Sequence, residues 1–334
     1  MATGMMIDGK WQKPSYQSDR YAPRQGRDRS GNFQRNPTTF RDRITADGSS
    51  GFKAESNRYH LYVSYACPWA HRTLIVRKLK GLEDVISLSV VHPFMGDEGW
   101  TFADFTNTIP DSINHAKYLR EVYAYADSNY TGRVTVPILW DKQTNTIVNN
   151  ESREIIEMFD REFAALATKK ISLYPDQLRD QINQTIDVIY NPINNGVYRA
   201  GFATSQEAYN EAIIELFENL DHWNHILGEQ RFLCGNSFTA ADVCLFTTLL
   251  RFDLVYYIHF KCNLRHLWDY ENLWNYLKEI YQHSGIKETS QLDHIKRHYY
   301  QSHSHINPSG IIPLGPIIDF DAPHNRNKFN SKAS

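Results

Sequence analysis

The sequence predicts an α/β domain followed by an all-α domain. Strand and helix patterns alternate from about residue 52 to 165, whereas residues 171 to 303 show only the 3.6-residue apolar spacing of helices. The length of 334 residues is sufficient for two separate hydrophobic cores. We therefore divide the chain into an extended N-terminal arm at 1–50, an α/β domain at 51–165, a helical domain at 171–303 and a C-terminal tail at 304–334.

The composition is that of a soluble globular protein. Hydrophobic residues make up 41% of the chain and charged residues 22%. The net charge of −2 gives no general reason to expect nucleic acid or an anionic membrane as a partner. No apolar run approaches the roughly 18 residues of a membrane span. We therefore expect neither of these partners.

Cysteine usage indicates a reducing compartment. The four cysteines are widely spaced, and residues 1–14 have no apolar region of the kind found in secretory signals. No C-x-x-C pair or His/Cys cluster has the spacing of a zinc site. We therefore expect reduced thiols, a cytoplasmic location and no metal.

The N-terminal arm has no regular pattern. Residues 1–50 are polar and rich in Gly, Ser, Gln and Arg, and neither a period of 2 nor a period of 3.6 runs through them. This composition predicts an extended segment that lies over the folded body. The tail at 304–334 has scattered prolines and glycines and is expected to be irregular.

The α/β domain begins with a strand at 58–63, where polar and apolar residues alternate. A helix to Lys80 and a second strand at 86–92 follow, and this order predicts a parallel pair joined by a right-handed crossover. The later elements are expected to be a short helix at 115–126 within an insert, a strand at 133–140 entered through Pro137, a returning strand at 146–148 and a helix from Ser152 to about residue 163.

Cys67 lies between the first strand and the first helix. Pro68 suits the first helical position, because its φ is already helical and the amide hydrogen that it lacks would have no partner there. Cys67 is therefore expected at or next to the N-cap, where unpaired N–H groups and the helix dipole favour a thiolate. The alternative is an inert core cysteine, although such residues usually lie inside elements.

The helical domain contains five segments with helical apolar spacing. Thr239 and Asp242 fit a capping box ahead of one of them, and Cys244 lies in that apolar run and is expected to be a core residue. The segments are 175–189, 205–227, 239–257, 271–283 and 290–301.

A set of short segments identifies a family. They are Cys67-Pro68-Trp69-Ala70-His71-Arg72, Gly99-Trp100, Thr135-Val136-Pro137, Asn150-Glu151-Ser152, Arg251-Phe252-Asp253, His259-Phe260-Lys261-Cys262-Asn263 and Lys296-Arg297-His298-Tyr299-Tyr300. Their combination resembles the glutathione transferase superfamily and, within it, the Xi class, the glutathionyl-hydroquinone reductases. The resemblance covers roughly residues 35 to 318. It implies a thioredoxin-like N-terminal domain and an all-α C-terminal domain, which together make the glutathione transferase fold, and it implies a homodimer.

The fourth residue of the cysteine motif limits the chemistry. Ala70 occupies the place of the second cysteine of a C-x-x-C motif, so Cys67 has no close resolving partner. A mixed disulfide on Cys67 must then be resolved by an external thiol. Glutathione is the abundant external thiol of reducing compartments, and we expect it as co-substrate.

The resemblance also implies a glutathione site. Val136 precedes Pro137, a cis-proline in thioredoxin-like folds, and its backbone is expected to pair with the extended tripeptide. Glu151 and Ser152 begin a helix, where they are expected to meet the γ-glutamyl ammonium and carboxylate. Their alternative role is a plain N-cap, and that of Pro137 is an ordinary trans turn. The remaining contacts are Arg133 to the glycyl carboxylate and Trp100 over the peptide or an aromatic substrate.

Late tyrosines are candidates for the second substrate. A tyrosine offers a flat apolar face and a hydroxyl that can bind a phenolic oxygen or give a proton to a leaving carbon. The resemblance favours Tyr198, Tyr256 and the pair Tyr299 and Tyr300. The alternative for each is half-buried packing.

These residues predict a glutathione-dependent reductase of glutathionyl-hydroquinones, in which Cys67 carries a mixed disulfide with glutathione. Two alternatives remain open. One is a broader thiol transferase or dehydroascorbate reductase, and the other is a non-catalytic glutathione-binding module. A conjugating transferase is disfavoured, because a catalytic cysteine favours mixed-disulfide chemistry.

Overall fold

The computed structural model describes residues 4–13, 30–33 and 37–332. They form two compact units that are not continuous in sequence. The first unit contains the described residues of 1–25 together with 37–171 and 289–311, and the second contains those of 26–36 together with 172–288 and 312–334. The linear domain boundaries given above remain a prediction, and residues 14–29 and 34–36 of the arm lie outside the described residues.

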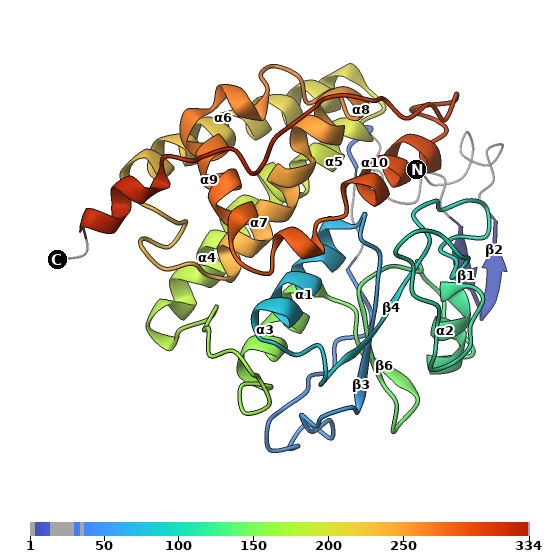
Figure 1. Ribbon diagram of the computed structural model, residues 1–334. Helices are drawn as coiled ribbons and strands as arrows, with labels where there is room; N and C mark the ends of the chain where they lie inside the picture. The colour runs from blue at the N-terminus through green and yellow to red at the C-terminus, as the bar shows by residue number, and fades with distance from the viewer. Residues whose placement is uncertain (1–3, 14–29, 34–36, 333–334) are drawn as a thin grey trace. The chain divides into compact units, whose positions relative to one another are not determined.

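A four-stranded sheet forms the centre of the first unit (Figure 1). Its strand order is β4-β3-β5-β6, with β3 and β4 parallel and the other pairs antiparallel. The predicted parallel pairing of the first two strands of this domain is confirmed by β3 and β4. All five residues of β3 are buried, as expected for a strand covered on both faces. The strands are β3 (Tyr59–Val63), β4 (Ser87–Val90), β5 (Ile138–Asp141) and β6 (Thr146–Asn149).

Helices lie on both sides of this sheet. Figure 1 shows α1 (Pro68–Leu79) and α3 (Ser152–Arg161) together on one side and α2 (Leu119–Ala126) on the other. Helix α2 begins four residues later than predicted, because the Glu121 carboxylate accepts hydrogen bonds from the N–H groups of residues 117 and 118 and ends the preceding loop. The first unit also contains α10 (Leu292–Ser302), far away in sequence.

The N-terminal arm contains a hairpin that the sequence analysis missed. Strands β1 (Met5–Ile7) and β2 (Lys10–Gln12) pair antiparallel around Asp8 and Gly9. Both turn residues have positive φ, +48° and +72°, which an Asp-Gly pair tolerates well. The turn signal was therefore present, but strands of three residues are too short for an alternating pattern to be recognised.

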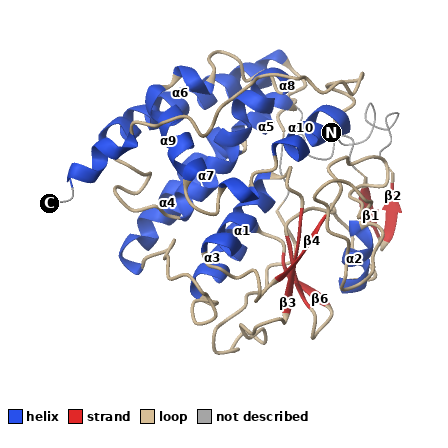
Figure 2. Cartoon of the chain, in the orientation of Figure 1, coloured by secondary structure: helices blue, strands red, loops and turns tan. Residues whose placement is uncertain are grey.

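The second unit is helical, as predicted (Figure 2). The predicted segment 239–257 is divided between an α-helix and a π-helix, and α5 was missed because its six residues include two glycines. The elements are η2 (Asp176–Leu178), α4 (Arg179–Ile189), the π-helix η3 (Tyr190–Asn194), α5 (Gly196–Gly201), α6 (Gln206–Glu229), α7 (Ala240–Arg251), the π-helix η4 (Phe252–Tyr256), α8 (Tyr257–His259), η5 (Leu267–Asp269) and α9 (Glu271–Gln282). The short 3-10 helix η6 (Lys287–Thr289) follows α9 in the chain.

The capping box predicted at Thr239 is present. The Asp242 carboxylate accepts hydrogen bonds from the backbone N–H and the hydroxyl of Thr239 at 2.8 and 3.0 Å. It also accepts one from the Tyr276 hydroxyl at 2.8 Å. The N-terminus of α7 is thereby fixed to α9, and Cys244 on α7 is fully buried as predicted.

The C-terminal tail ends in a short helix, which corrects the expectation of a fully irregular segment. The 3-10 helix η7 (Arg326–Lys332) places the Arg326 guanidinium, 0% exposed, at the end of α6. The guanidinium donates hydrogen bonds to the carbonyls of Leu227, Gln230 and Arg231 at 2.5 to 2.8 Å. Arg326 thus donates to one carbonyl in the last turn of α6, that of Leu227, and to the carbonyls of the two residues that follow the helix.

His60 on β3 is a buried neutral histidine, and we predict that it makes stability pH-dependent. Ser89 donates to the Pro110 carbonyl and so accepts from His60 Nε2–H at 2.9 Å, while Ser87 Oγ lies 2.7 Å from Nδ1. Burial lowers the pKa of His60 to about 4. Its ordinary pKa in the unfolded chain is higher, so the stabilisation present above pH 6.5 is lost as the pH falls toward 4. The free energy of unfolding is expected to fall by about 2 kcal/mol from this group between pH 7.5 and 5.

Urea unfolding at both pH values tests this. His60→Gln should remove that part of the pH dependence, whereas His225→Gln, which replaces an exposed histidine, should leave it unchanged. Equal pH dependence in the wild type and His60→Gln would contradict the prediction.

Candidate active site

Cys67 is the N-cap of α1, as predicted. Its backbone is extended (φ −76°, ψ 122°), its carbonyl accepts the first helical hydrogen bond from His71 at 2.9 Å, and Pro68 follows in the first turn. The side chain is half-buried, and Sγ lies 3.6 Å from the Val136 carbonyl oxygen. The aligned peptide dipoles of α1 favour a negative charge at this end, which suits a thiolate.

The segment opposite Cys67 is fixed by a tyrosine that the sequence analysis missed. The Val136–Pro137 peptide bond is cis, as the resemblance implied. The Tyr123 hydroxyl lies 3.0 Å from the Thr135 carbonyl and accepts a hydrogen bond from Asn150 Nδ2 at 3.1 Å. Tyr123 therefore links the cis-proline segment to the residues before α3. Its position on the buried face of the predicted short helix was the available signal.

Glu151 and Ser152 lie at the start of α3. Glu151 is the N-cap, and its carboxylate accepts from Arg153 N–H at 3.3 Å and from the Ser152 hydroxyl at 3.4 Å. The capping role considered for Glu151 is therefore present. The Glu151 backbone N–H is itself held by Asn149 Oδ1 at 2.7 Å.

A buried arginine from α1 also reaches this helix start. Arg72 is 2% exposed, Nη1 lies 3.5 Å from Ser152 Oγ, and its guanidinium lies 4.3 Å above the Trp69 ring. A guanidinium beside a helix N-terminus suits a carboxylate ligand. Arg72 was quoted in the family motif but not chosen as a site residue, because its contact with Ser152 joins positions 80 apart in the chain.

Trp100 is connected to α10 through His298, another residue missed from sequence. Trp100 is 6% exposed, and its ring stacks on His298 with centroids 4.7 Å apart and planes at 22°. His298 Nδ1–H donates to the Pro93 carbonyl at 3.0 Å, which fixes the imidazole plane. The Tyr299 ring meets His298 edge-on at 5.2 Å. Trp100 and Tyr299 thus belong to one aromatic cluster.

The remaining predicted residues of the first unit have simpler surroundings. Tyr300 is 4% exposed, and burial raises its pKa to about 12, so its hydroxyl stays protonated at neutral pH. Arg133 is half-buried and precedes Val136 by three residues. Its carbonyl accepts a hydrogen bond from the Tyr130 hydroxyl at 2.9 Å.

Tyr198 and Tyr256 lie together in the second unit. Tyr198 belongs to α5 and Tyr256 to η4, and their ring centroids are 5.9 Å apart. Phe260 contacts both rings, each at 5.4 Å. Both tyrosines are buried, 6% and 0% exposed. The structure therefore brings these two candidates into one aromatic cluster and also gives each the packing role that was its alternative.

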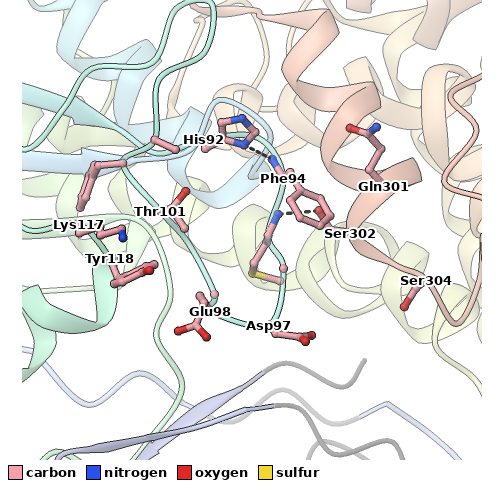
Figure 3. Close-up of a pocket in the computed structure, with 15 residues that line it drawn as sticks. His92, Phe94, Asp97, Glu98, Thr101, Lys117, Tyr118, Gln301, Ser302 and Ser304 are labelled. Carbon is pink, nitrogen blue, oxygen red and sulfur yellow. Dashed lines mark hydrogen bonds between the residues drawn. The ribbon is translucent and has the colours of Figure 1, made fainter.

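A cavity of about 730 Å³ lies in the first unit (Figure 3). Its wall combines aromatic side chains with the polar side chains of Asp97, Glu98, Thr101, Lys117 and Ser302. None of the predicted site residues, all of which are described, lines it, but Gly99 and Thr101 on either side of Trp100 do. The lining residues are His92, Phe94, Met95, Gly96, Asp97, Glu98, Gly99, Thr101, Phe102, Ala103, Lys117, Tyr118, Gln301, Ser302 and Ser304.

The described residues contain neither a metal-binding cluster nor a membrane-spanning helix. In these parts of the chain no group of three or more His, Cys, Asp or Glu side chains is arranged to hold a metal ion. Among the same residues, no helix has both the length and the apolar character needed to cross a membrane.

Family models match both halves of the chain. Residues 66–162 match the model described as "Glutathione S-transferase, N-terminal domain", and residues 206–279 match "Glutathione S-transferase, C-terminal domain". The two matches contain Cys67, Trp100, Glu151 and Tyr256.

Several known proteins are similar to this chain over nearly its whole length. The glutathionyl-hydroquinone reductase YqjG of Escherichia coli is 51% identical over 97% of this chain and 98% of its own. Its glutathione-bound structure aligns with a TM-score of 0.88, at 50% identity, over 97% of this chain and 99% of that one. The glutathionyl-hydroquinone reductase PcpF of Sphingobium chlorophenolicum is 46% identical over 94% and 96% of the two chains. A Xi-class glutathione transferase structure from Natrialba magadii has a TM-score of 0.90 at 49% identity and covers 97% of each chain.

The fold, the cysteine at the mouth of α1 and the adjacent cis-proline agree with these matches. On this evidence the chain belongs to the glutathione transferase superfamily and, within it, to the Xi class that includes the glutathionyl-hydroquinone reductases.

Proposed function

We propose that this protein reduces glutathionyl-hydroquinones to hydroquinones at the expense of glutathione. The observation that carries the proposal is the position of Cys67, at the N-terminus of α1 with Sγ 3.6 Å from the carbonyl beside the cis-proline. Two relatives about half identical over nearly the full length carry this activity in their names, and one of them was solved with glutathione bound.

The reaction begins with a thiolate attack on sulfur. The Cys67 thiolate attacks the sulfur of the glutathionyl group, the bond from that sulfur to the aromatic carbon breaks, and the carbon takes the electron pair and a proton. Cys67 is left in a mixed disulfide with glutathione. A second glutathione, as thiolate, attacks this disulfide, so that oxidised glutathione leaves and the Cys67 thiolate returns. The aromatic substrate gains two electrons, and two glutathione sulfurs are oxidised.

The residues around Cys67 support a glutathione site. An extended tripeptide pairs with the Val136 backbone next to Pro137, as a strand-like segment would. Its γ-glutamyl carboxylate lies at the N-terminus of α3, where Ser152 and the buried Arg72 supply donors, and its ammonium pairs with Glu151. Arg133 receives the glycyl carboxylate, and Trp100 contacts the peptide or the aromatic ring.

The tyrosines receive the aromatic group in this proposal. Tyr198, Tyr256, Tyr299 and Tyr300 are all largely buried, and their hydroxyls bind the phenolic oxygens of the hydroquinone. Burial raises the pKa of Tyr300 to about 12, so its hydroxyl is protonated at neutral pH and can donate a hydrogen bond to a phenolic oxygen. These assignments are supported by the family resemblance and by the burial of each tyrosine.

The test compares three acceptors with the purified protein and glutathione. A kcat/KM for a glutathionyl-hydroquinone well above those for dehydroascorbate and for a glutathionylated small-molecule disulfide supports the proposal. Higher values for the latter two would replace it by a broader thiol transferase. Glutathione binding without turnover of any of the three would indicate a binding module.

Assembly and location complete the proposal. A homodimer is supported by the family resemblance and by exposed apolar side chains of the second unit, among them Ile258 at 56% and Leu264 at 61% exposure. A molar mass near 39 kDa by light scattering, the mass of one chain, would contradict it. A cytoplasmic location is supported by the four cysteines, all described and all present as thiols.

A further inference from the structure

The N-terminal hairpin is attached to the segment that precedes Arg133 and the cis-proline. Met6 and Gly132 exchange two backbone hydrogen bonds, at 2.9 and 3.0 Å, so β1 continues into a bridge with this segment. The tip of the hairpin adds a hydrogen bond from Gly9 N–H to the Tyr130 carbonyl at 3.1 Å. It adds another from Asp8 N–H to the Thr131 hydroxyl at 2.8 Å.

The other strand of the hairpin holds the loop that precedes Trp100. Trp11 Nε1–H donates to the Asp97 carbonyl at 3.0 Å, and Lys13 Nζ lies 2.5 Å from the Glu98 carboxylate. The Trp11 ring also packs on Gly99, where a Cβ would lie 3.0 Å from the indole. Gly99 has φ +73°, so both its conformation and this contact require glycine.

Arg120 on α2 completes the attachment. Its guanidinium donates to the Glu98 carbonyl at 2.5 Å and to the Glu98 carboxylate at 2.6 Å. The same guanidinium lies 5.2 Å from the Trp11 ring and 3.9 Å from the Tyr118 ring. The loop at 97–99 is therefore held both by Trp11 and by Arg120 of α2. Asp97, Glu98, Lys117 and Tyr118 also line the cavity of Figure 3.

We propose that the hairpin at 5–12 is a positioning element of the glutathione site, and that Trp11 is its principal residue. The hairpin connects the two segments that enter this site, 97–100 with Trp100 and 130–137 with Arg133 and Val136. Neither segment belongs to the central sheet, whose strand β5 begins only at Ile138. The position of the two segments relative to each other therefore depends on contacts such as those of the hairpin. The inference rests on the proposed glutathione site. It adds to that site a positioning residue, Trp11, which lies 89 positions before Trp100 in the chain.

Trp11→Ala tests the proposal in the full-length protein. Glutathione affinity is measured by calorimetry, which does not require turnover, and the KM for glutathione and kcat are measured with a glutathionyl-hydroquinone. We expect the Kd and KM for glutathione to rise about tenfold, because the segments that bind the tripeptide are misplaced. We expect kcat to change less than about twofold, because Cys67, which carries out the chemical step, belongs neither to the hairpin nor to these two segments. Trp11→Phe keeps a ring on Gly99 but loses the N–H donor, and an increase of about threefold is expected.

The control is Ile7→Ala, which changes a 40%-exposed side chain of the same hairpin. Its Kd for glutathione is expected to equal that of the wild type. Should Trp11→Ala fail to fold, Trp11→Phe carries the test. A wild-type Kd in whichever of these two variants is folded, or an equal rise in Ile7→Ala, would overturn the proposal. Failure of the proposed reductase activity is a separate result, because it would appear as absent turnover in the wild type. The comparison of the glutathione Kd between the wild type and the variants does not depend on turnover.

Discussion

Replacement of Cys67 by serine is expected to abolish reductase turnover. A serine hydroxyl does not attack sulfur to form a disulfide, and the N-terminus of α1 stabilises a thiolate but leaves a hydroxyl protonated. Loss of the nucleophile should lower kcat/KM for a glutathionyl-hydroquinone by a factor on the order of 10⁴ or more. The glutathione contacts remain in place, so calorimetry should give a Kd for glutathione close to that of the wild type.

A matched control is available among the other cysteines. Cys234 is buried, and its thiol donates to the Thr185 hydroxyl at 3.7 Å, a contact that a serine can keep. Cys234→Ser should retain wild-type kcat/KM. Mass spectrometry of the intact protein, after reaction with a glutathionyl-hydroquinone in the absence of free glutathione, should find a glutathione adduct in the wild type and in Cys234→Ser but not in Cys67→Ser. Substantial activity in Cys67→Ser would exclude the mixed-disulfide mechanism.

The second large effect is expected on stability, from Arg326→Ala. The Arg326 guanidinium is fully buried and serves three carbonyls at the end of α6. Its Nε also lies 3.5 Å from the carboxylate of Glu279, a long ion pair. Removal of the side chain takes away these three hydrogen bonds and leaves the Glu279 carboxylate, among the described residues, with the ion pair to Arg231 alone. The free energy of unfolding should fall by about 3 to 4 kcal/mol.

Urea unfolding of the two proteins at 25 °C measures this loss. Lys328→Ala provides the comparison, because it removes an exposed positive charge from the same 3-10 helix and should cost less than about 0.5 kcal/mol. Arg326→Lys should recover only part of the loss, since one ammonium cannot bond to three carbonyls in the plane of a guanidinium. A loss in Arg326→Ala no larger than that in Lys328→Ala would show that the tail contributes nothing to α6.

Local chemistry in the sequence was sufficient for the central part of the site. Pro68 after a predicted strand indicated that Cys67 caps α1, and the capping pattern at Thr239 indicated the start of α7; both are confirmed. Each of these inferences uses residues within four positions of one another, where backbone preferences decide the conformation. The cis-proline came from the family resemblance, not from local chemistry.

The parts that sequence reasoning missed depend on tertiary contacts. Arg72 reaches Ser152, His298 stacks on Trp100, and Trp11 holds the loop at Asp97, at separations of 80, 198 and 86 positions. A helical pattern shows which face of a helix is buried but not which side chain lies opposite. The helix at 290–301 was correctly predicted as a helix, but its periodicity carried no information on the unit in which it packs.

Because α10 belongs to the first unit but follows most of the second unit in sequence, the first unit cannot be complete until late in synthesis on the ribosome. The sheet and its flanking helices are synthesised by residue 171, but the histidine that stacks on Trp100 leaves the exit tunnel only after the whole of 172–288. A nascent chain that already carries Cys67, Pro137 and the start of α3 therefore still lacks His298, the residue that stacks on the Trp100 indole. Glutathione binding by such chains should mature late in translation, and a ribosome-stalled chain ending before residue 289 should contain the nucleophile without the finished site.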